Sequence, residues 1–263
     1  MSVPPCFDIR LREGKKVFFA SDFHLGVPNA EASLARERRI VRWLNRIAPD
    51  AQTIFLVGDI FDFWFEYRRA VPRGFLRLQG KLAELTDGGT QVVFFTGNHD
   101  AWMFDYFTNE LGIVVHRQPQ CYRINDARFY IGHGDGLGPG DHSFKLLKRV
   151  FASPAAQWVF AGLHPNVGIG LANKWSARSR LRNQARDETF KGEDEWLWVY
   201  CQEMEARQHH DYYVFGHRHL PLDLPVGTTS RYLNLGEWVN FSTYACFDGQ
   251  RMRLAEFADN EPA

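Results

Sequence analysis

Short apolar runs rich in β-branched and aromatic residues alternate with amphipathic stretches through the first half of the chain. Three of these runs predict buried strands, at residues 16–20, 53–57 and 91–96. The stretches between them, near residues 32–47 and 75–85, carry apolar residues at helical spacing. Strands that alternate with helices are typical of a layered α/β fold.

The second half of the chain keeps the strand pattern but loses the helices between strands. Four further runs predict strands, at residues 128–131, 212–215, 231–235 and 243–247. Because no comparable helix separates the last of them, we expect the second half to add a more antiparallel sheet. The predicted architecture is α/β, with two packed mixed β-sheets flanked by helices in a single domain spanning residues 1–263.

One segment, residues 140–191, interrupts this pattern. Strand signals disappear there, and apolar, aromatic and basic residues mix at helical spacing. We interpret residues 140–191 as a helical cap inserted into the domain, and call this segment the insertion. No stretch approaches the ~20 apolar residues that cross a bilayer, and residues 1–10 lack the apolar core of a signal peptide. We therefore expect a cytoplasmic protein.

Charge and cysteine content add two expectations. The formal net charge is zero, with a sequence pI of about 7.2, so no global field attracts nucleic acid and we expect no nucleic-acid partner. The four cysteines are widely scattered and include no Cys-x-x-Cys pair, which favours reduced thiols that serve as packing residues. They are Cys6, Cys121, Cys201 and Cys246.

Five short polar blocks follow predicted strands, where α/β sheets gather their functional loops. The blocks are Asp22-Phe23-His24, Gly58-Asp59, Gly97-Asn98-His99-Asp100, Gly132-His133-Gly134-Asp135 and Gly216-His217-Arg218-His219. Carboxylate, amide and imidazole groups are ligands of divalent metal ions, and alternate residues point the same way in extended backbone. We expect the glycines to allow tight turns and close approach of a phosphate.

A single block of this kind is more often a surface pair or a satisfied core histidine. Five blocks in order predict a two-metal site, because buried charges without partners are costly.

The order of the blocks resembles the calcineurin-like metallophosphoesterase family. The resemblance implies that one ion is held by Asp22, His24 and His219, a second by Asn98, His133 and His217, with Asp59 as the bridge. Two such ions lower the pKa of a bound water and support in-line attack on phosphorus. We expect Mn²⁺, which suits the mixed ligand set, although iron, cobalt or zinc fit it too.

The same resemblance implies an acid–base pair beside the metals. His99 matches the family histidine that contacts the phosphate and can protonate the leaving group, and Asp62 stands where the dyad carboxylate belongs. The alternative for Asp62 is a helix cap or a surface acid. Protein serine/threonine phosphatases of this fold place an Arg just after that Asp, whereas Phe63 and Trp64 follow here, which argues against a protein phosphatase.

Longer stretches resemble the UDP-2,3-diacylglucosamine pyrophosphohydrolase branch of the family, which serves lipid A biosynthesis. These stretches are residues 21–26, 61–64, 133–135 with Asp141, and 236–238. The resemblance implies hydrolysis of the diphosphate of UDP-2,3-diacylglucosamine to UMP and 2,3-diacylglucosamine 1-phosphate. The best-known members carry Arg in place of His99, so this chain represents a divergent branch. By position, the candidate substrate contacts are Asp141, Ser176, Arg178 and Ser179.

The insertion carries nine basic and three acidic residues among large apolar ones. This mixture suits an acylated, anionic ligand or an anionic membrane, so we expect an acylated UDP-sugar as substrate and peripheral association with the inner face of the cytoplasmic membrane. The alternative is an ordinary helical hairpin with a solvated basic face. Two other functions stay open: a nuclease or cyclic-nucleotide phosphodiesterase on the same core, and a non-catalytic scaffold.

Overall fold

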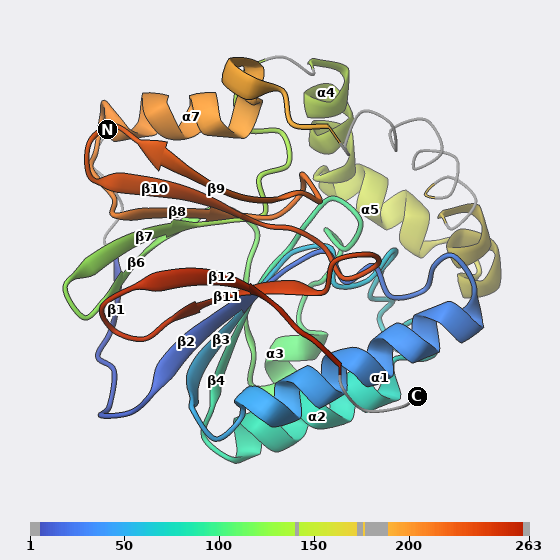
Figure 1. The fold of residues 1–263 in the computed structure, drawn as a ribbon. Helices are drawn as coiled ribbons and strands as arrows, with labels where there is room; N and C mark the ends of the chain where they lie inside the picture. The colour runs from blue at the N-terminus through green and yellow to red at the C-terminus, as the bar shows by residue number, and fades with distance from the viewer. Residues whose placement is uncertain (1–5, 140–141, 173–175, 177–188, 260–263) are drawn as a thin grey trace.

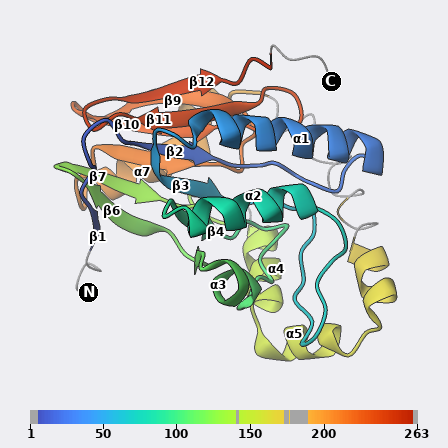
Figure 2. The same cartoon turned by 90° about the horizontal axis from the view of Figure 1, so that it is seen from below.

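Two six-stranded sheets stack face to face, and helices cover their outer faces (Figures 1 and 2). This architecture comes from a computed structural model that describes residues 6–139, 142–172, 176 and 189–259. The first sheet has the strand order β12 (Met252–Glu256), β11 (Thr243–Phe247), β2 (Lys16–Ala20), β3 (Ala51–Val57), β4 (Gln91–Phe95), β5 (Val114–His116). The second has the order β1 (Phe7–Ile9), β6 (Gln120–Ile124), β7 (Ala127–Ile131), β8 (Tyr212–Phe215), β10 (Ser230–Leu235), β9 (Pro221–Val226).

The helices form the two outer layers and one flank. Helices α1 (Ala30–Ile47), α2 (Leu76–Asp87) and α3 (Tyr106–Leu111) cover the first sheet, and α7 (Trp196–Glu205) covers the second (Figure 1). In the insertion, α4 (His142–Phe151), α5 (Pro154–Ala161) and a helical stretch at residues 165–172 are described, followed by the short 3-10 helix η1 (Gly192–Asp194). None of the described helices is long and apolar enough to cross a membrane.

The central strands are buried on both faces, which explains their continuous apolar sequences. In β2, Val17 and Phe19 join the cluster between the sheets, whereas Phe18 and Ala20 join the cluster under α1 and α2. A strand with two covered faces needs apolar residues at every position rather than at alternate ones. The prediction of buried strands from these runs is confirmed, and β2, β8 and β11 have the predicted bounds.

The expectation of a more antiparallel second sheet is wrong. Both sheets are equally mixed, because β7, β8 and β10 run parallel to one another while the hairpin β11–β12 joins the first sheet beside β2. Parallel strands need a long crossover connection, and residues 132–211, which contain the insertion and α7, supply it between β7 and β8.

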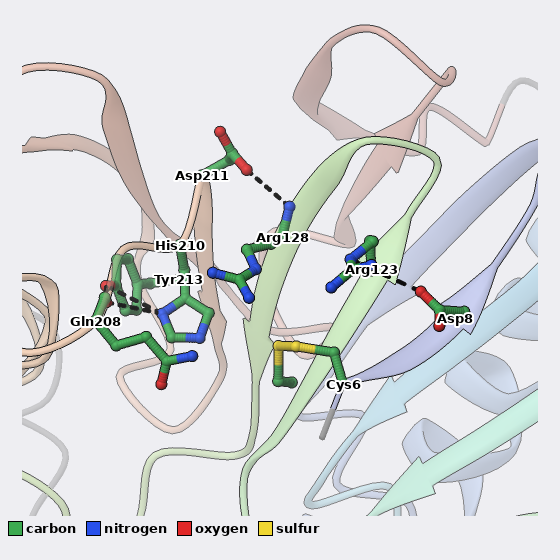
Figure 3. The surroundings of a disulfide bond; sticks show 9 residues. Cys6, Asp8, Arg123, Arg128, Gln208, His210, Asp211 and Tyr213 are labelled. Atoms are coloured by element: carbon green, nitrogen blue, oxygen red, sulfur yellow. Dashed lines mark hydrogen bonds and ion pairs between the residues drawn. A yellow bond between two sulfur atoms is a disulfide. The ribbon is translucent and has the colours of Figure 1, made fainter. Parts of the chain in front are cut away.

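The expectation of four reduced thiols is also wrong for one pair. Cys6 and Cys121 form a disulfide, which Figure 3 shows beside strands β1 and β6. The parallel pairing of these strands sets Phe7 opposite Tyr122, so the residues that precede them lie side by side. The other two cysteines are free and, as predicted, contribute to packing: Cys201 is buried and Cys246 is half-buried.

Candidate metal centre

The five polar blocks meet at one edge of the sandwich. Strands β2, β3 and β4 of the first sheet run parallel, as do β7 and β8 of the second, so each set presents its carboxyl ends together. The insertion borders this edge, since Trp102 Nε1 donates to the carbonyl of Phe151 at 2.9 Å and Lys148 Nζ lies 2.6 Å from Asp135 Oδ2.

Asp22, His24 and His219 form the first predicted ligand set. Asp22 Oδ1 lies 3.2 Å from His219 Nε2 and 3.6 Å from His24 Nε2, and the two imidazole nitrogens are 3.0 Å apart. Three ligand atoms from the ends of β2 and β8 therefore converge on one point, as a cation requires.

The second predicted ligand set approaches Asp59 through His133. His133 Nε2 lies 3.3 Å from Asp59 Oδ2, and the ligand atoms of Asp22, Asp59 and His133 all lie within 4.8 Å of one another. The imidazole of His217 faces that of His133, with ring centroids 5.2 Å apart. Asp22 and Asp59 thus connect the two sets, in agreement with a bridging carboxylate.

Backbone groups hold the side chains of Asp22, Asp59 and His133 so that one atom of each stays available to a metal ion. The backbone N–H of His217 donates to Asp22 Oδ2 at 3.0 Å, and that of His99 donates to Asp59 Oδ1 at 2.9 Å. His133 Nδ1 lies 2.9 Å from the carbonyl of Val57, which fixes the tautomer with Nε2 as the ligand atom.

The buried atoms at this edge that make no hydrogen bond of good geometry with any residue that the structure describes include Asp22 Oδ1, Asn98 Oδ1 and His133 Nε2. Such atoms are rare in folded proteins, and all three are of the types that bind divalent cations. The residues present therefore fit a divalent metal centre.

The electrostatics of the site favour the ligand forms of its side chains. Burial would raise the pKa of both Asp22 and Asp59, but the neighbouring histidines, His133 first among them, lower it, so both carboxylates are ionised. Burial lowers the pKa of His217 to about 4, so its imidazole is neutral. The pKa of His133 is raised, because Asp59 and Asp22 outweigh its burial, and a metal competes with a proton for its Nε2.

Left-handed backbone geometry is concentrated in the ligand loops. Eight described non-glycine residues have positive φ, and five of them are proposed ligands: Asp22, His24, Asp59, His217 and His219. The expectation that Asp22 and His24, or His217 and His219, converge through extended backbone is therefore wrong. Each such residue costs about 1–2 kcal/mol, a strain that typically persists at functional sites.

Two glycines of the blocks make room for proposed ligands that follow a different strand. A Cβ on Gly97 would lie 2.2 Å from Asp59 Oδ1, and a Cβ on Gly216 would lie 2.4 Å from Asp22 Oδ2. Neither glycine has positive φ. The requirement at these positions is space for a neighbouring carboxylate rather than turn geometry.

We expect Gly97→Ala to weaken metal binding about 10- to 100-fold, because the added Cβ would displace the Asp59 carboxylate. Loss of a residue that supports a metal ligand typically lowers affinity by this much. The matched control is Gly80→Ala in α2, where an added Cβ meets nothing within 4 Å. That variant should raise the melting temperature, because alanine is favoured over glycine in a helix by about 1 kcal/mol, and should bind metal normally. Titration calorimetry with Mn²⁺ measures both variants, and normal binding by Gly97→Ala would contradict the close packing described.

His99 and Asp62 lie beside the first ligand set. His99 Nδ1 is 2.9 Å from the main-chain carbonyl of Asp62, and the Asp62 carboxylate stands 3.7 Å from both His99 Nδ1 and His24 Nδ1. Asp62 is buried, so it is not a surface acid. Burial lowers the pKa of His99 to about 4, and its Nε2 lies 4.0 Å from Asp59 Oδ2, within reach of the metal cluster.

Of the candidate substrate contacts, only Ser176 lies in the described part of the chain. Its Oγ donates to Asp62 Oδ2 at 2.8 Å and lies 3.1 Å from His99 Nδ1, so it contacts the predicted acid–base pair. Asp141, Arg178 and Ser179 lie outside the described residues.

Asp100, for which the sequence predicts no role, supports two of the metal loops. Its buried carboxylate accepts backbone hydrogen bonds from Gly97 at 2.7 Å and from Ile60 at 2.8 Å, with longer ones from Asp59 and Phe61. Asp100 therefore ties the loop of Asp59 to the loop of Asn98. The sequence could have indicated this role, because Asp100 is the acid at the end of the Gly97-Asn98-His99-Asp100 block and aspartate side chains commonly accept hydrogen bonds from nearby backbone N–H groups.

Comparison with known proteins agrees with this geometry. The family model "Calcineurin-like phosphoesterase" matches residues 15–221. The chain is 39% identical to the UDP-2,3-diacylglucosamine hydrolase of Porphyromonas gingivalis (strain ATCC BAA-308 / W83), over 94% of this chain and 99% of that protein. It is 26% identical to the enzyme of the same name from Aeromonas salmonicida (strain A449), over 93% and 95% of the two chains. The chain belongs to the calcineurin-like phosphoesterase family.

Proposed function

We propose that this protein hydrolyses the diphosphate of UDP-2,3-diacylglucosamine to UMP and 2,3-diacylglucosamine 1-phosphate, a step of lipid A biosynthesis. The observation that carries the proposal is the end-to-end similarity to the P. gingivalis UDP-2,3-diacylglucosamine hydrolase, supported by the ligand atoms of Asp22, His24, Asp59, His133 and His219, which lie close together. The similarity spans the insertion as well as the metal loops.

Two divalent ions are the proposed cofactors, with Mn²⁺ as the preferred metal. Asp22, His24 and His219 would hold one ion, Asn98, His133 and His217 would hold the other, and Asp59 would serve both. When bound, the ions lower the pKa of a water molecule and neutralise charge on the phosphoryl oxygens. The mixed donor set supports manganese over metals that prefer thiolate ligands.

The proposed acid–base chemistry belongs to His99. Its Nδ1 is held by the carbonyl of Asp62 and by Ser176, so Nε2 faces the metal cluster, where the imidazolium form of the ring would contact the phosphate or donate a proton to the leaving oxygen. Asp62 and Ser176 orient the ring. Arg178 and Ser179 remain proposed substrate contacts, as does Asp141.

The insertion, with proposed bounds 140–191, is the proposed acyl-binding element. A cavity of about 350 Å³ opens between α4, α5 and the loop of Trp102, and almost all of its lining is apolar: Trp102, Val150, Phe151, Ala155, Ala156, Val159, Phe160 and Leu163. Phe160 packs inward against Phe65 and Trp102, whereas Trp158 is 79% exposed. Acyl methylenes buried here would contribute about 0.8 kcal/mol each.

We expect Val159→Ser to raise the KM for the diacylated substrate about tenfold, because it removes apolar lining worth one to two methylenes. Hydrolysis of a small chromogenic phosphodiester should not change. Val159 is 62% exposed, so the fold tolerates the change, and Val114→Ser on β5 is the matched control at 43% exposure. Equal loss of both activities would show a packing role instead, and no change in either would place the acyl groove elsewhere.

Peripheral binding to the inner face of the cytoplasmic membrane is part of the proposal. The exposed apolar side chains Trp158, Val159, Val167 and Leu171 accompany the basic residues of the insertion. Basic residues near an anionic surface add about 1 kcal/mol each, so flotation with anionic vesicles should fall steeply with salt. Equal flotation with neutral vesicles would contradict the electrostatic contribution.

A substrate screen tests the proposed function against its rivals. Purified protein with Mn²⁺ is offered UDP-2,3-diacylglucosamine, a cyclic nucleotide and DNA at equal concentrations, and initial rates are compared. We expect the UDP-sugar lipid to be cleaved fastest. Faster cleavage of DNA or of the cyclic nucleotide would overturn the substrate, and no hydrolysis together with no bound metal would indicate a scaffold.

A further inference from the structure

A buried ion pair lies between two of the proposed metal ligands. Arg218, which separates His217 from His219, is completely buried, as is its partner Glu195. The pairing is bidentate: Arg218 Nε donates to Glu195 Oε1 at 2.6 Å and Nη2 donates to Glu195 Oε2 at 3.1 Å. The fork of a guanidinium fixes direction as well as distance, so the contact determines how the backbone of Arg218 is oriented.

The side-chain contacts of Arg218 with described residues come from one short segment. Nη2 also donates to the carbonyl of Thr189 at 3.0 Å, and the guanidinium lies over the ring of Trp196, 4.4 Å from its centroid. Lys191 lies 4.4 Å from the same ring. The contacts therefore join the metal loop after β8 to the end of the insertion and the start of α7.

The flanking residues need such an anchor. His217 and His219 both have left-handed backbone, with φ of 70° and 54°, which is unfavourable for non-glycine residues. Their side chains serve different ligand sets: His219 approaches Asp22 and His24, whereas His217 faces His133. One fixed residue between them orients both.

We infer that Arg218 and Glu195 are positioning residues that hold His217 and His219 toward the two metal ions and link the end of the insertion to the metal centre. The inference rests on the metal ligands of the proposed function. A buried ion pair is by itself a weak source of stability, since an apolar pair of similar size is often as stable. Here the Arg218–Glu195 pair orients the loop that carries His217 and His219.

The experiment separates positioning from stability with the double variant Arg218→Met/Glu195→Leu, which removes both charges together and leaves none unpaired. Mn²⁺ affinity and stoichiometry are measured by calorimetry, the spin coupling of the two ions by electron paramagnetic resonance, and the melting temperature on metal-free protein. Arg218→Lys keeps the charge but loses the fork and should show an intermediate effect. Glu205→Gln is the control, because Glu205 lies at the far end of α7 and binds His209 and Tyr213.

We expect the double variant to stay folded and to lose the spin-coupled signal of the two ions. It should bind Mn²⁺ about 10- to 100-fold more weakly, which is the usual loss of affinity when a residue that supports a metal ligand is replaced. Glu205→Gln should lower the melting temperature and leave metal binding unchanged. Wild-type affinity and coupling in the double variant would overturn the inference. Failure of the wild-type protein to bind two ions would instead overturn the metal assignment of the proposed function. If the double variant does not fold, Arg218→Lys decides by the same measurements.

Discussion

Replacing Asp59 by alanine is expected to reduce hydrolysis by at least ~10³-fold and to remove at least one bound metal ion while the sheets stay assembled. The reason is geometric, because Asp59 follows β3 at the centre of the site and its carboxylate reaches both His133 and the loop of His99. Metal content by elemental analysis, steady-state rates and circular dichroism measure the three parts of the expectation.

Asp59→Asn sharpens this test. Asparagine keeps an oxygen that can accept the N–H of His99, as Asp59 Oδ1 does at 2.9 Å, but removes the charge that a metal bridge needs. It should lose metal and activity nearly as fully as alanine does. The control is Asp50→Ala, which removes a half-exposed acid paired with Lys16 and should change neither quantity. Near-normal hydrolysis by Asp59→Ala would contradict the two-metal assignment.

Replacing His99 by alanine is expected to lower kcat by ~10²–10⁴-fold with both metal ions retained, the range for loss of a general acid. The neighbouring Asn98 supplies the ligand of that block, and His99 Nε2 lies 4.0 Å from Asp59 Oδ2. A chromogenic substrate whose leaving group needs no proton should be affected less than the UDP-sugar lipid.

His99→Arg provides the comparison with the better-known branch of the family. Arginine offers a permanent charge to the phosphate but no titratable proton near neutral pH, so KM should be retained better than kcat. Loss of metal in proportion to activity in His99→Ala would make His99 a ligand. The grouping of His99 with His24 and Asp59 within 4.8 Å makes that outcome a real alternative.

Much of the site was predictable because its signals are local. Each proposed ligand follows an apolar run, and the parallel strands β2, β3 and β4 of one sheet and β7 and β8 of the other each place their ligands at their carboxyl ends. The left-handed backbone of the ligands was not predictable, since neither aspartate nor histidine requires it. The space beside Gly97 also depends on which carboxylate the neighbouring strand presents.

Non-local pairings explain the remaining differences. The Cys6–Cys121 disulfide joins residues 115 positions apart and follows from the pairing of β1, a three-residue strand too short to be seen in the sequence. Helix α7 was not predicted because its apolar residues surround the helix rather than forming a stripe. The crossover that contains α7 and makes β7 and β8 parallel was therefore not predicted either.

We propose that metal-activated water attacks the diphosphate of UDP-2,3-diacylglucosamine at the phosphorus nearer uridine, as the resemblance to the pyrophosphohydrolase branch implies. The most direct test is a single hydrolysis in ¹⁸O-labelled water with Mn²⁺, followed by mass spectrometry of both products. We expect UMP that carries one labelled oxygen and unlabelled 2,3-diacylglucosamine 1-phosphate. Label in the lipid phosphate would contradict the site of attack, and the absence of UMP would contradict the proposed reaction itself.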